Sequence, residues 1–364
     1  MLGVVAGFDI GGTKISLVLV DQEGEPVFRS IEPTDSTSGH VEHTPEYTIY
    51  DGLGAQLMRM LRAALLESEA PPLRAIGIVS AGPIRNGDLW SPPNIVPDGI
   101  AESHRDLPRR IPLVEPLRRA FSCPVGLLND CNGAVLGEVY FGLGRETPDK
   151  ATLHLAYATI STGFGVGAWD GGRLILGKDG NAGEIGHLVT RIDGLRCGCG
   201  HCGCVEAYAS GSGIVTNART RLLALSEVER EASPLVALLP RDGRLGPPAR
   251  EFGDLLGEIT PALVFDAAEK GDQTARAVIE DANLAAGIGL SAIANAYDPE
   301  VISVGGAIAL AHPEILDPIR EEMLRHINVV PPRVVLTPLG AHVTEQGAVA
   351  LARRLADGGS ATRR

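Results

Sequence analysis

The sequence predicts a two-domain α/β protein, and three observations support this fold class. The chain has 364 residues, which is more than one ordinary hydrophobic core requires. Its 44% hydrophobic residues, 4% aromatic residues, 45 glycines and 25 prolines are typical of a globular protein with many tight turns. Two strand pairs with glycine turns, at residues 3–21 and 153–172, lie far apart in the chain and suggest two similar lobes.

The N-terminal segments predict a hairpin, a loop and a helix. Two apolar runs around a glycine pair predict the hairpin over 3–21. The polar, turn-rich segment 32–50 is expected to be an exposed excursion. Leucine and methionine at helical spacing predict a helix over 51–70, which Pro71 ends.

The later segments continue the alternation of strands and helices. Residues 73–84 predict a buried strand that runs into a glycine turn, and residues 121–142 predict a strand followed by a helix. Residues 300–310 predict another strand and glycine turn. Proline-broken helical pieces at 218–257 suggest a surface insertion, and the small polar tail at 356–364 is expected to be frayed.

The charge and the cysteine pattern exclude several classes of protein. A net charge of −13 without a basic patch argues against nucleic acid and anionic membrane as partners. Cys123 and Cys131 lie in apolar segments and the other four cysteines are bunched, which favours a reducing cytoplasm over a secreted disulfide scaffold. The N-terminus has no basic leader segment, and we expect no apolar run to approach the ~20 residues that a membrane span needs. We therefore expect a soluble cytoplasmic protein.

The first glycine turn, DIGGTK at residues 9–14, can bind a phosphate. Gly11 and Gly12 can take positive φ, which lets backbone N–H groups approach an anion. Asp9 is placed to hold a magnesium-bound water, and Thr13 can donate to phosphate oxygens. A plain hairpin turn can use the same glycine pair, so both interpretations stay open.

Two further glycine turns offer similar chemistry. The segment STGFG at 161–165 presents hydroxyl and backbone donors from Ser161, Thr162 and Gly163. Gly305 and Gly306 could let a base or ribose lie against the backbone, although any turn from strand to helix can use such glycines.

Asp130 follows a buried strand and stands at the start of a helix. A carboxylate at this position can serve as the N-cap of the helix. It can also act as the general base that accepts a proton from a hydroxyl attacking phosphorus. Asn129 would then orient the hydroxyl-rich substrate.

Five motifs in this order resemble the ROK sugar kinases: DIGGTK, NDCNGAVLGE, STGFG, GNAGEIGH and CGCGHCGCVEAYASG. The resemblance runs from about residue 4 to about residue 352. It implies an actin-like ATPase fold of the ribonuclease H-like type, in which two lobes close on a sugar with ATP between them. The small lobe is expected at 1–128 with a C-terminal helix at about 345–358, and the large lobe at 129–344.

The resemblance also implies roles for individual residues. Asp130 is the expected catalytic base, and the expected sugar ligands are Gly82, Asn129, Asp130, Glu184, His187 and Glu206. The expected nucleotide-binding residues are Asp9, Gly11, Gly12, Thr13, Lys14, Ser161, Thr162, Gly163, Gly305 and Gly306. The segment SAGPI around Gly82 departs from the commoner Pro-Gly-Pro sequence of the family. The segments 32–50 and 218–257 are longer than the resemblance leads us to expect.

The cysteine cluster predicts a structural zinc site. Zinc takes four soft or borderline ligands in a tetrahedron, and His187, Cys197, Cys199 and Cys204 supply one imidazole and three thiolates. Cys202 falls at a variable position of the family pattern, and Cys202 and His201 are left over. A redox switch through residues 199–202 is an alternative, whereas a nucleic-acid finger would need paired CxxC motifs and a basic surface.

Together these features predict an ATP-dependent hexose kinase that uses Mg²⁺ and contains Zn²⁺. Glucose is the first expected substrate, converted to glucose 6-phosphate, because residues 177–187 and 91–95 resemble glucokinases most closely. Alternatives are an N-acetylhexosamine or fructose kinase, a sugar-binding regulator and a non-sugar ATPase. A regulator of this family would carry a DNA-binding segment ahead of residue 9, where this sequence has eight residues. A homodimer or homotetramer is expected.

Overall fold

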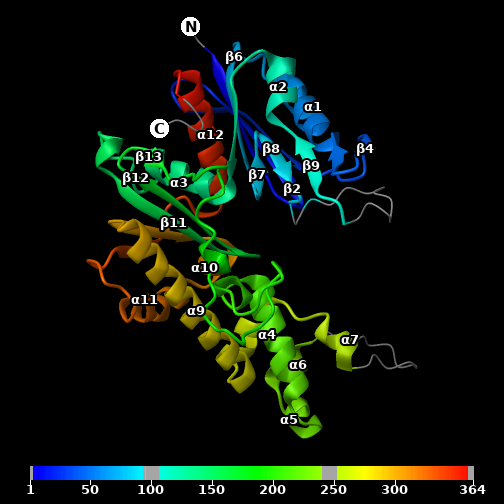
Figure 1. Ribbon diagram of the computed structural model, residues 1–364, viewed down its shortest axis with the longest axis vertical. Coiled ribbons are helices and arrows are strands. Elements are labelled where there is room, and N and C mark those ends of the chain that lie inside the picture. The colour runs from blue at the N-terminus through cyan, green and yellow to red at the C-terminus, as the bar shows by residue number, and fades with distance from the viewer. Residues whose placement is uncertain (1–2, 93–94, 96–105, 240–251, 360–364) are drawn as a thin grey trace. The chain divides into compact units, whose positions relative to one another are not determined.

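The computed structural model describes residues 3–92, 95, 106–239 and 252–359, which form two compact units (Figure 1). The first unit comprises residues 1–157, 167–183 and 337–364, and the second comprises residues 158–166 and 184–336. The first unit extends past the boundary predicted at residue 128, because residues 125–140 pack against its sheet and its C-terminal helix. How the functional lobes divide stays a prediction.

A five-stranded sheet forms the centre of the first unit. Its strands are β1 (Val4–Ile10), β2 (Lys14–Val20), β3 (Pro26–Pro33), β6 (Leu73–Ser80) and β10 (Val125–Asn129). They lie in the order β10-β6-β1-β2-β3. Strands β1, β2 and β3 are antiparallel, whereas β6 is parallel to β1 and β10 is parallel to β6. The strands predicted at the N-terminus, at 73–84 and at 121–142 are thus confirmed.

Helices from both ends of the chain cover this sheet. They are α1 (Gly52–Glu67), α2 (Val114–Phe121), α3 (Asp130–Tyr140) and α12 (Val343–Ala356). The helix predicted over 51–70 is confirmed as α1, whose Leu53, Leu57 and Leu61 are fully buried. Helix α12 packs against β1, β6 and α3 (Figure 1, red), so the last helix completes the core begun by the first strand.

A small second sheet corrects the expectation that 32–50 is an exposed excursion. Its strands are β4 (Val41–His43), β5 (Thr48–Tyr50), β7 (Ile84–Arg85), β8 (Asp88–Trp90) and β9 (Arg109–Pro112), in the order β4-β5-β9-β8-β7. Thr48 and Tyr50 are buried, and the Tyr50 hydroxyl donates to the carbonyl of Ser38 at 2.6 Å. The segment is polar because its connecting loops are exposed, while β5 itself belongs to the core.

The third sheet repeats the strand order of the first. It contains β11 (His154–Ile160), β12 (Phe164–Asp170), β13 (Arg173–Leu174), β14 (Val301–Gly305) and β15 (Arg333–Leu336), in the order β13-β12-β11-β14-β15. In both sheets the first strand along the chain is central, with the second and third on one side and the fourth and fifth on the other. The two sheets therefore share one strand order, and each begins with a glycine-turn hairpin; the division into two similar lobes stays a prediction.

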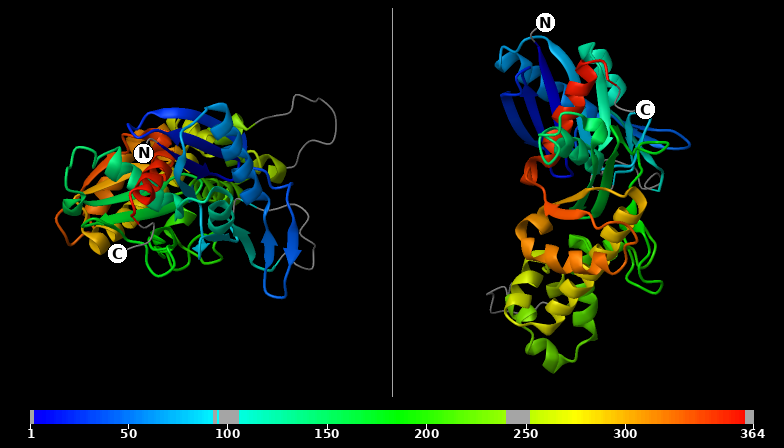
Figure 2. Two further views of the ribbon diagram at one scale, coloured as in Figure 1. Left: turned by 90° about the horizontal axis from the view of Figure 1, so that it is seen from above. Right: turned by 90° about the vertical axis from the view of Figure 1, so that its left-hand side faces the viewer.

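Helices make up most of the second unit. They are α4 (Gly211–Ala224), α5 (Glu227–Glu231), α6 (Pro234–Leu238), α7 (Phe252–Leu256), α8 (Pro261–Glu269), α9 (Gln273–Tyr297), α10 (Ala307–Ala311) and α11 (Leu316–Leu324). Helices α9 and α11 lie side by side (Figures 1 and 2). Residues 240–251 of the predicted insertion and residues 360–364 of the predicted frayed tail lie outside the described residues, as do parts of 91–95.

Helix α9 corrects one expectation about membrane spans. Over the described residues it alone is long and apolar enough to cross a membrane by length and composition, with a mean hydropathy of 1.3 over its most apolar window. However, 56% of that window is buried inside the protein, where α9 packs against α4, α8 and α11. A core helix passes the same test, so this helix is weak evidence for a membrane span.

Candidate active site

The first glycine turn joins β1 to β2. The N–H of Gly11 donates to the carbonyl of Lys14 at 2.9 Å, and the hydroxyl of Thr34 donates to the carbonyl of Gly11 at 2.7 Å. Gly11 and Gly12 do not take positive φ, so that expectation is wrong: the turn closes within ordinary backbone conformations. Among the described contacts, the N–H groups of Gly12 and Thr13 have no acceptor, which leaves two donors for an anion.

Asp9 lies at the end of β1, just before this turn. Its Oδ2 accepts a hydrogen bond from the hydroxyl of Thr344 at 2.7 Å. Burial raises the pKa of Asp9 to about 6, although the Thr344 hydrogen bond opposes the shift. Asp130 and Glu345 contribute negative charge that raises it further. Thr344 is 335 positions away in the sequence, and no local motif singles it out.

We expect Asp9→Asn to stabilise the folded protein above pH 6. The pKa of Asp9 is raised from its ordinary value of 3.8 to about 6, so the carboxyl group of Asp9 binds its proton more tightly in the folded chain than in the unfolded chain. The contribution of Asp9 to the free energy of unfolding therefore falls between about pH 4 and pH 6 and is constant above. Asparagine cannot ionise, so the variant should gain up to ~3 kcal/mol at pH 8 and less at pH 5. Urea unfolding at both pH values tests this, and a variant no more stable than the wild type at pH 8 would contradict it.

Asn129 and Asp130 stand where β10 ends and α3 begins, as predicted. Asn129 is the N-cap, because its Oδ1 accepts the N–H of Cys131 at 2.9 Å. The N-cap role considered for Asp130 therefore belongs to its neighbour. Asp130 is the first helical residue, and its Oδ1 accepts the same N–H at 2.9 Å. Burial raises the pKa of Asp130, while the hydrogen bonds from Cys131 lower it.

Gly82 follows β6 and lies close to Asn129. A Cβ atom built on Gly82 would be 3.5 Å from the Asn129 Nδ2 and 3.5 Å from the Asn181 Oδ1. The first unit thus brings Gly82, Asn129 and Asn181 together. Asn181 lies inside the quoted motif GNAGEIGH, but the sequence gives no signal for its contacts.

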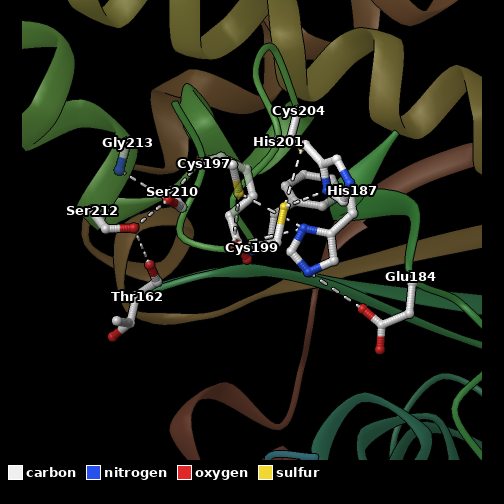
Figure 3. Close-up of polar contacts among 12 residues, drawn as sticks. Thr162, Glu184, His187, Cys197, Cys199, His201, Cys204, Ser210, Ser212 and Gly213 are labelled. Atoms are coloured by element: carbon white, nitrogen blue, oxygen red, sulfur yellow. Dashed lines mark hydrogen bonds and ion pairs between the residues drawn. The ribbon is translucent and has the colours of Figure 1, made fainter. Parts of the chain in front are cut away.

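The second glycine turn joins β11 to β12. The N–H of Ser161 donates to the carbonyl of Gly163 at 3.0 Å, and its carbonyl accepts the N–H of Gly211 at 2.7 Å. Helix α4 begins here, and the hydroxyl of Ser212 in its first turn donates to the carbonyl of Thr162 at 3.1 Å (Figure 3). A groove of about 460 Å³ lies beside this turn. Its lining includes Ser161, Thr162, Ser212, Val215, Ala307 and Ile308.

The third glycine turn, at Gly305 and Gly306, ends β14 directly before Ala307, which lines that groove. Gly306 has a φ of 92°, and a Cβ there would lie 2.5 Å from the carbonyl oxygen of Ile160. Glycine is therefore required at this position both for conformation and for space. The second unit places Gly306 against the end of β11, directly before Ser161.

The cysteine cluster assembles the four predicted ligands and leaves out the two predicted spares. The ligand atoms of His187, Cys197, Cys199 and Cys204 all lie within 4.8 Å of one another (Figure 3). The Cys199 and Cys204 sulfurs are 3.7 Å apart, and the Cys197 sulfur is 3.8 Å from His187 Nδ1. A tetrahedron with zinc distances of ~2.0–2.3 Å has ligand separations of about 3.3–3.8 Å, and these two separations agree with that range. Cys202 is exposed and outside the group.

Glu184, His187 and Glu206 converge next to this cluster. Nε2 of His187 lies 3.7 Å from the Glu184 carboxylate, on the opposite side of the ring from the Nδ1 that faces the sulfurs (Figure 3). Glu206 accepts the N–H of Phe164 at 3.0 Å through Oε2, and its Oε1 is 3.6 Å from the Cys197 sulfur. The side chains of Glu184 and His187 are 62% and 37% exposed, so both can reach a ligand.

An ion-pair network holds the cysteine loop to the helices of the second unit. Arg191 in the loop pairs with Asp281 of α9 at 2.6 Å, and its guanidinium lies 4.6 Å from the ring centre of Tyr208. Arg221 of α4 pairs with the other oxygen of Asp281 at 2.6 Å. The sequence gives no signal for Asp281, which lies 90 positions from Arg191.

Comparison with known proteins identifies the family. The ROK family model matches residues 5–356. The chain is 32% identical over 331 residues to a glucokinase from Streptomyces coelicolor, covering 89% of this chain and 88% of that protein. It is 34% identical over 216 residues to an N-acetylmannosamine kinase from Escherichia fergusonii, covering 59% and 64%.

A solved structure agrees over nearly the whole chain. It is a ROK family glucokinase from Streptomyces griseus in complex with glucose and AMPPNP, with a TM-score of 0.66 and 30% identity, covering 97% of this chain and 100% of that one. The fold is thus of the actin-like ATPase type, as the sequence motifs imply. The chain belongs to the ROK family.

Proposed function

We propose that this protein is an ATP-dependent hexose kinase with Asp130 as its general base. The position of Asp130 carries the proposal: it is held between the end of a buried strand and the first turn of a helix, with a pKa raised by burial. A carboxylate whose pKa is raised accepts a proton more readily than an ordinary carboxylate. The glucokinase relatives support the same function.

In the proposed reaction the 6-hydroxyl of the sugar attacks the γ-phosphorus of ATP in line with the leaving oxygen. Its proton passes to the carboxylate of Asp130, and ADP leaves. Magnesium would neutralise charge on the phosphates, and Asp9 would hold one of its waters. The Oδ1 of Asn129 accepts the N–H of Cys131, and its side-chain amide, which also donates toward Asp130, would donate to a sugar oxygen.

The proposed nucleotide site uses the three glycine turns. Two of the turns would supply donors to phosphate: the N–H groups of Gly12 and Thr13 in one unit, and the hydroxyls of Ser161 and Thr162 in the other. Gly11, Lys14, Gly163, Gly305 and Gly306 complete the proposed set. The groove of about 460 Å³ beside Ser161 has room for part of a nucleotide.

The proposed sugar ligands are Gly82, Asn129, Asp130, Glu184, His187 and Glu206. Within the second unit, zinc on Nδ1 of His187 would fix the ring and leave Nε2 for a sugar hydroxyl. Zinc would also fix Cys204 two residues before Glu206, so that the loop presents its carboxylates in one arrangement. The grouping of one imidazole and three thiolates within 4.8 Å of one another supports this role.

Glucose is the proposed preferred substrate. Carboxylates and amides recognise hydroxyl groups that glucose, mannose and N-acetylated hexosamines share, so they do not choose among these sugars. The glucokinase relative covers 89% of this chain, whereas the N-acetylmannosamine kinase covers 59%, which favours glucose.

A panel of kcat/KM values with ATP tests both the reaction and the substrate. The panel contains glucose, mannose, fructose, glucosamine, N-acetylglucosamine and N-acetylmannosamine, and we expect glucose to give the highest value. An N-acetylated sugar that exceeds glucose by more than about tenfold, or ~1.4 kcal/mol, would establish the amino-sugar kinase instead. Hexose binding without ADP release would indicate a regulator, and ADP release without hexose an ATPase of another kind.

A further inference from the structure

One side chain joins the Gly82 turn to the segment that precedes Glu184. Oδ1 of Asn181 accepts the N–H of Ile84 at 2.8 Å, and its Nδ2 donates to the carbonyl of Ile84 at 2.7 Å. Both ends of one amide thus bind both backbone groups of one residue, 97 positions away in the chain. Aspartate has no donor for this pairing and alanine has neither group.

The pairing occupies the open edge of a sheet. Ile84 begins β7, the edge strand of the small sheet, and among the described strands β7 pairs with β8 alone. Asn181 binds the other side of this strand, where its backbone groups would otherwise need another partner. Ile84 is only 7% exposed, so these groups cannot simply turn to water.

Asn181 is itself held in a short closed loop. The N–H of Ala182 donates to the carbonyl of Leu176 at 3.0 Å, and Nδ2 of Asn181 also approaches the carbonyl of Asp179 at 3.5 Å. The amide therefore connects two rigid segments of the first unit. A Cβ atom built on Gly82 would lie 3.5 Å from the Asn181 Oδ1 and 3.5 Å from the Asn129 Nδ2, so this amide and Asn129 both border Gly82.

We propose that Asn181 is a positioning residue, which fixes the wall formed by residues 82–84 beside Asn129 and so sets the affinity for the hexose. The proposal rests on the hexose kinase function above and deepens it. The wall belongs to the segment SAGPI, whose sequence departs from the Pro-Gly-Pro sequence common in the family. Asn181 supplies the contact that holds this segment.

Kinetics of Asn181 variants with the preferred hexose and ATP test this role. Asn181→Ala removes both hydrogen bonds and should raise KM for the hexose by about tenfold or more, while KM for ATP and kcat stay within about threefold. Asn181→Asp keeps the acceptor but turns a carboxylate oxygen toward the carbonyl of Ile84, so its KM should rise at least as much. A role in stability alone would lower the amount of active enzyme and leave KM unchanged.

Asn295→Ala is the matched control. Its Nδ2 donates to the carbonyl of His326 at 3.0 Å and its Oδ1 accepts the N–H of Asn328 at 2.9 Å, so it bridges backbone in the same way. None of its partners belongs to the proposed sugar or nucleotide site, and its KM for hexose should equal that of the wild type.

The outcomes separate this role from the proposed function. If the wild type phosphorylates a hexose and Asn181→Ala keeps the wild-type KM, the positioning role is overturned and the kinase proposal stands. If the wild type phosphorylates no hexose, the kinase proposal fails. The wild type and Asn181→Ala are then compared by their Kd for glucose, measured by titration calorimetry. An equal Kd in the wild type and Asn181→Ala, or no binding by the wild type, then overturns the positioning role as well.

Discussion

Asp130→Asn should lower kcat by about 10²- to 10⁴-fold and leave hexose binding within about threefold of the wild type. The amide has the size of the carboxylate and can still accept the N–H of Cys131, as Asp130 does at 2.9 Å. It cannot accept a proton from the attacking hydroxyl. Steady-state kinetics with the preferred hexose give kcat, and titration calorimetry without nucleotide gives the Kd.

Asp149→Asn provides the control for this substitution. Asp149 accepts the N–H of Ala151 at 2.9 Å at the start of a short 3₁₀ helix, so its carboxylate makes a comparable backbone contact. It contacts no proposed ligand of sugar or nucleotide, and kcat should not change. Near-normal turnover in Asp130→Asn would rule out Asp130 as the base.

The second large effect concerns the metal. Purified protein should contain about one zinc per chain, and Cys204→Ser should lose it. Cys204 is fully buried and its sulfur lies 3.7 Å from that of Cys199, so a serine there removes one of the four ligands. Loss of the metal frees His187 and the segment before Glu206, and KM for the hexose should rise by about 10- to 100-fold. Metal analysis by mass spectrometry and hexose kinetics measure the two effects.

Cys202→Ser tests whether the right thiolates have been chosen. Cys202 is exposed and lies outside the group of four, so this variant should retain its zinc and its KM. Loss of zinc from Cys202→Ser would show that Cys202 is a ligand. Absence of zinc from the wild type, with all four cysteines of residues 197–204 reactive toward a thiol reagent, would refute the site and favour the redox alternative.

Local sequence patterns predicted the elements whose cause is itself local. The hairpin at residues 4–20 follows from two apolar runs around glycines, and α1 follows from leucines at helical spacing. Strand β5 was missed because its partner β9 lies about 60 positions further along the chain, so no local pattern shows the pairing. The length and apolar character of α9 were underestimated because alanines and glycines dilute the pattern of its larger residues.

The candidate site divides in the same way. The zinc ligands were predicted because three of them are spaced within eight residues, and the structure brings His187 to them. Thr344, Asn181 and Asp281 were not predicted, since each acts on a partner 90 or more positions away and none stands in a spacing that implies that partner. Positive φ at Gly11 and Gly12 was expected from composition, but an antiparallel turn closed by Gly11 and Lys14 does not require it.

Phosphorus NMR of the reaction mixture tests the central claim most directly. Wild-type protein with glucose, ATP and magnesium should produce one new phosphomonoester signal, coupled to the two protons on carbon 6, in amounts equal to the ADP formed. Omission of glucose should abolish both the phosphomonoester signal and the formation of ADP. Inorganic phosphate in place of the phosphomonoester, or ADP formation that does not depend on any hexose, would contradict the account.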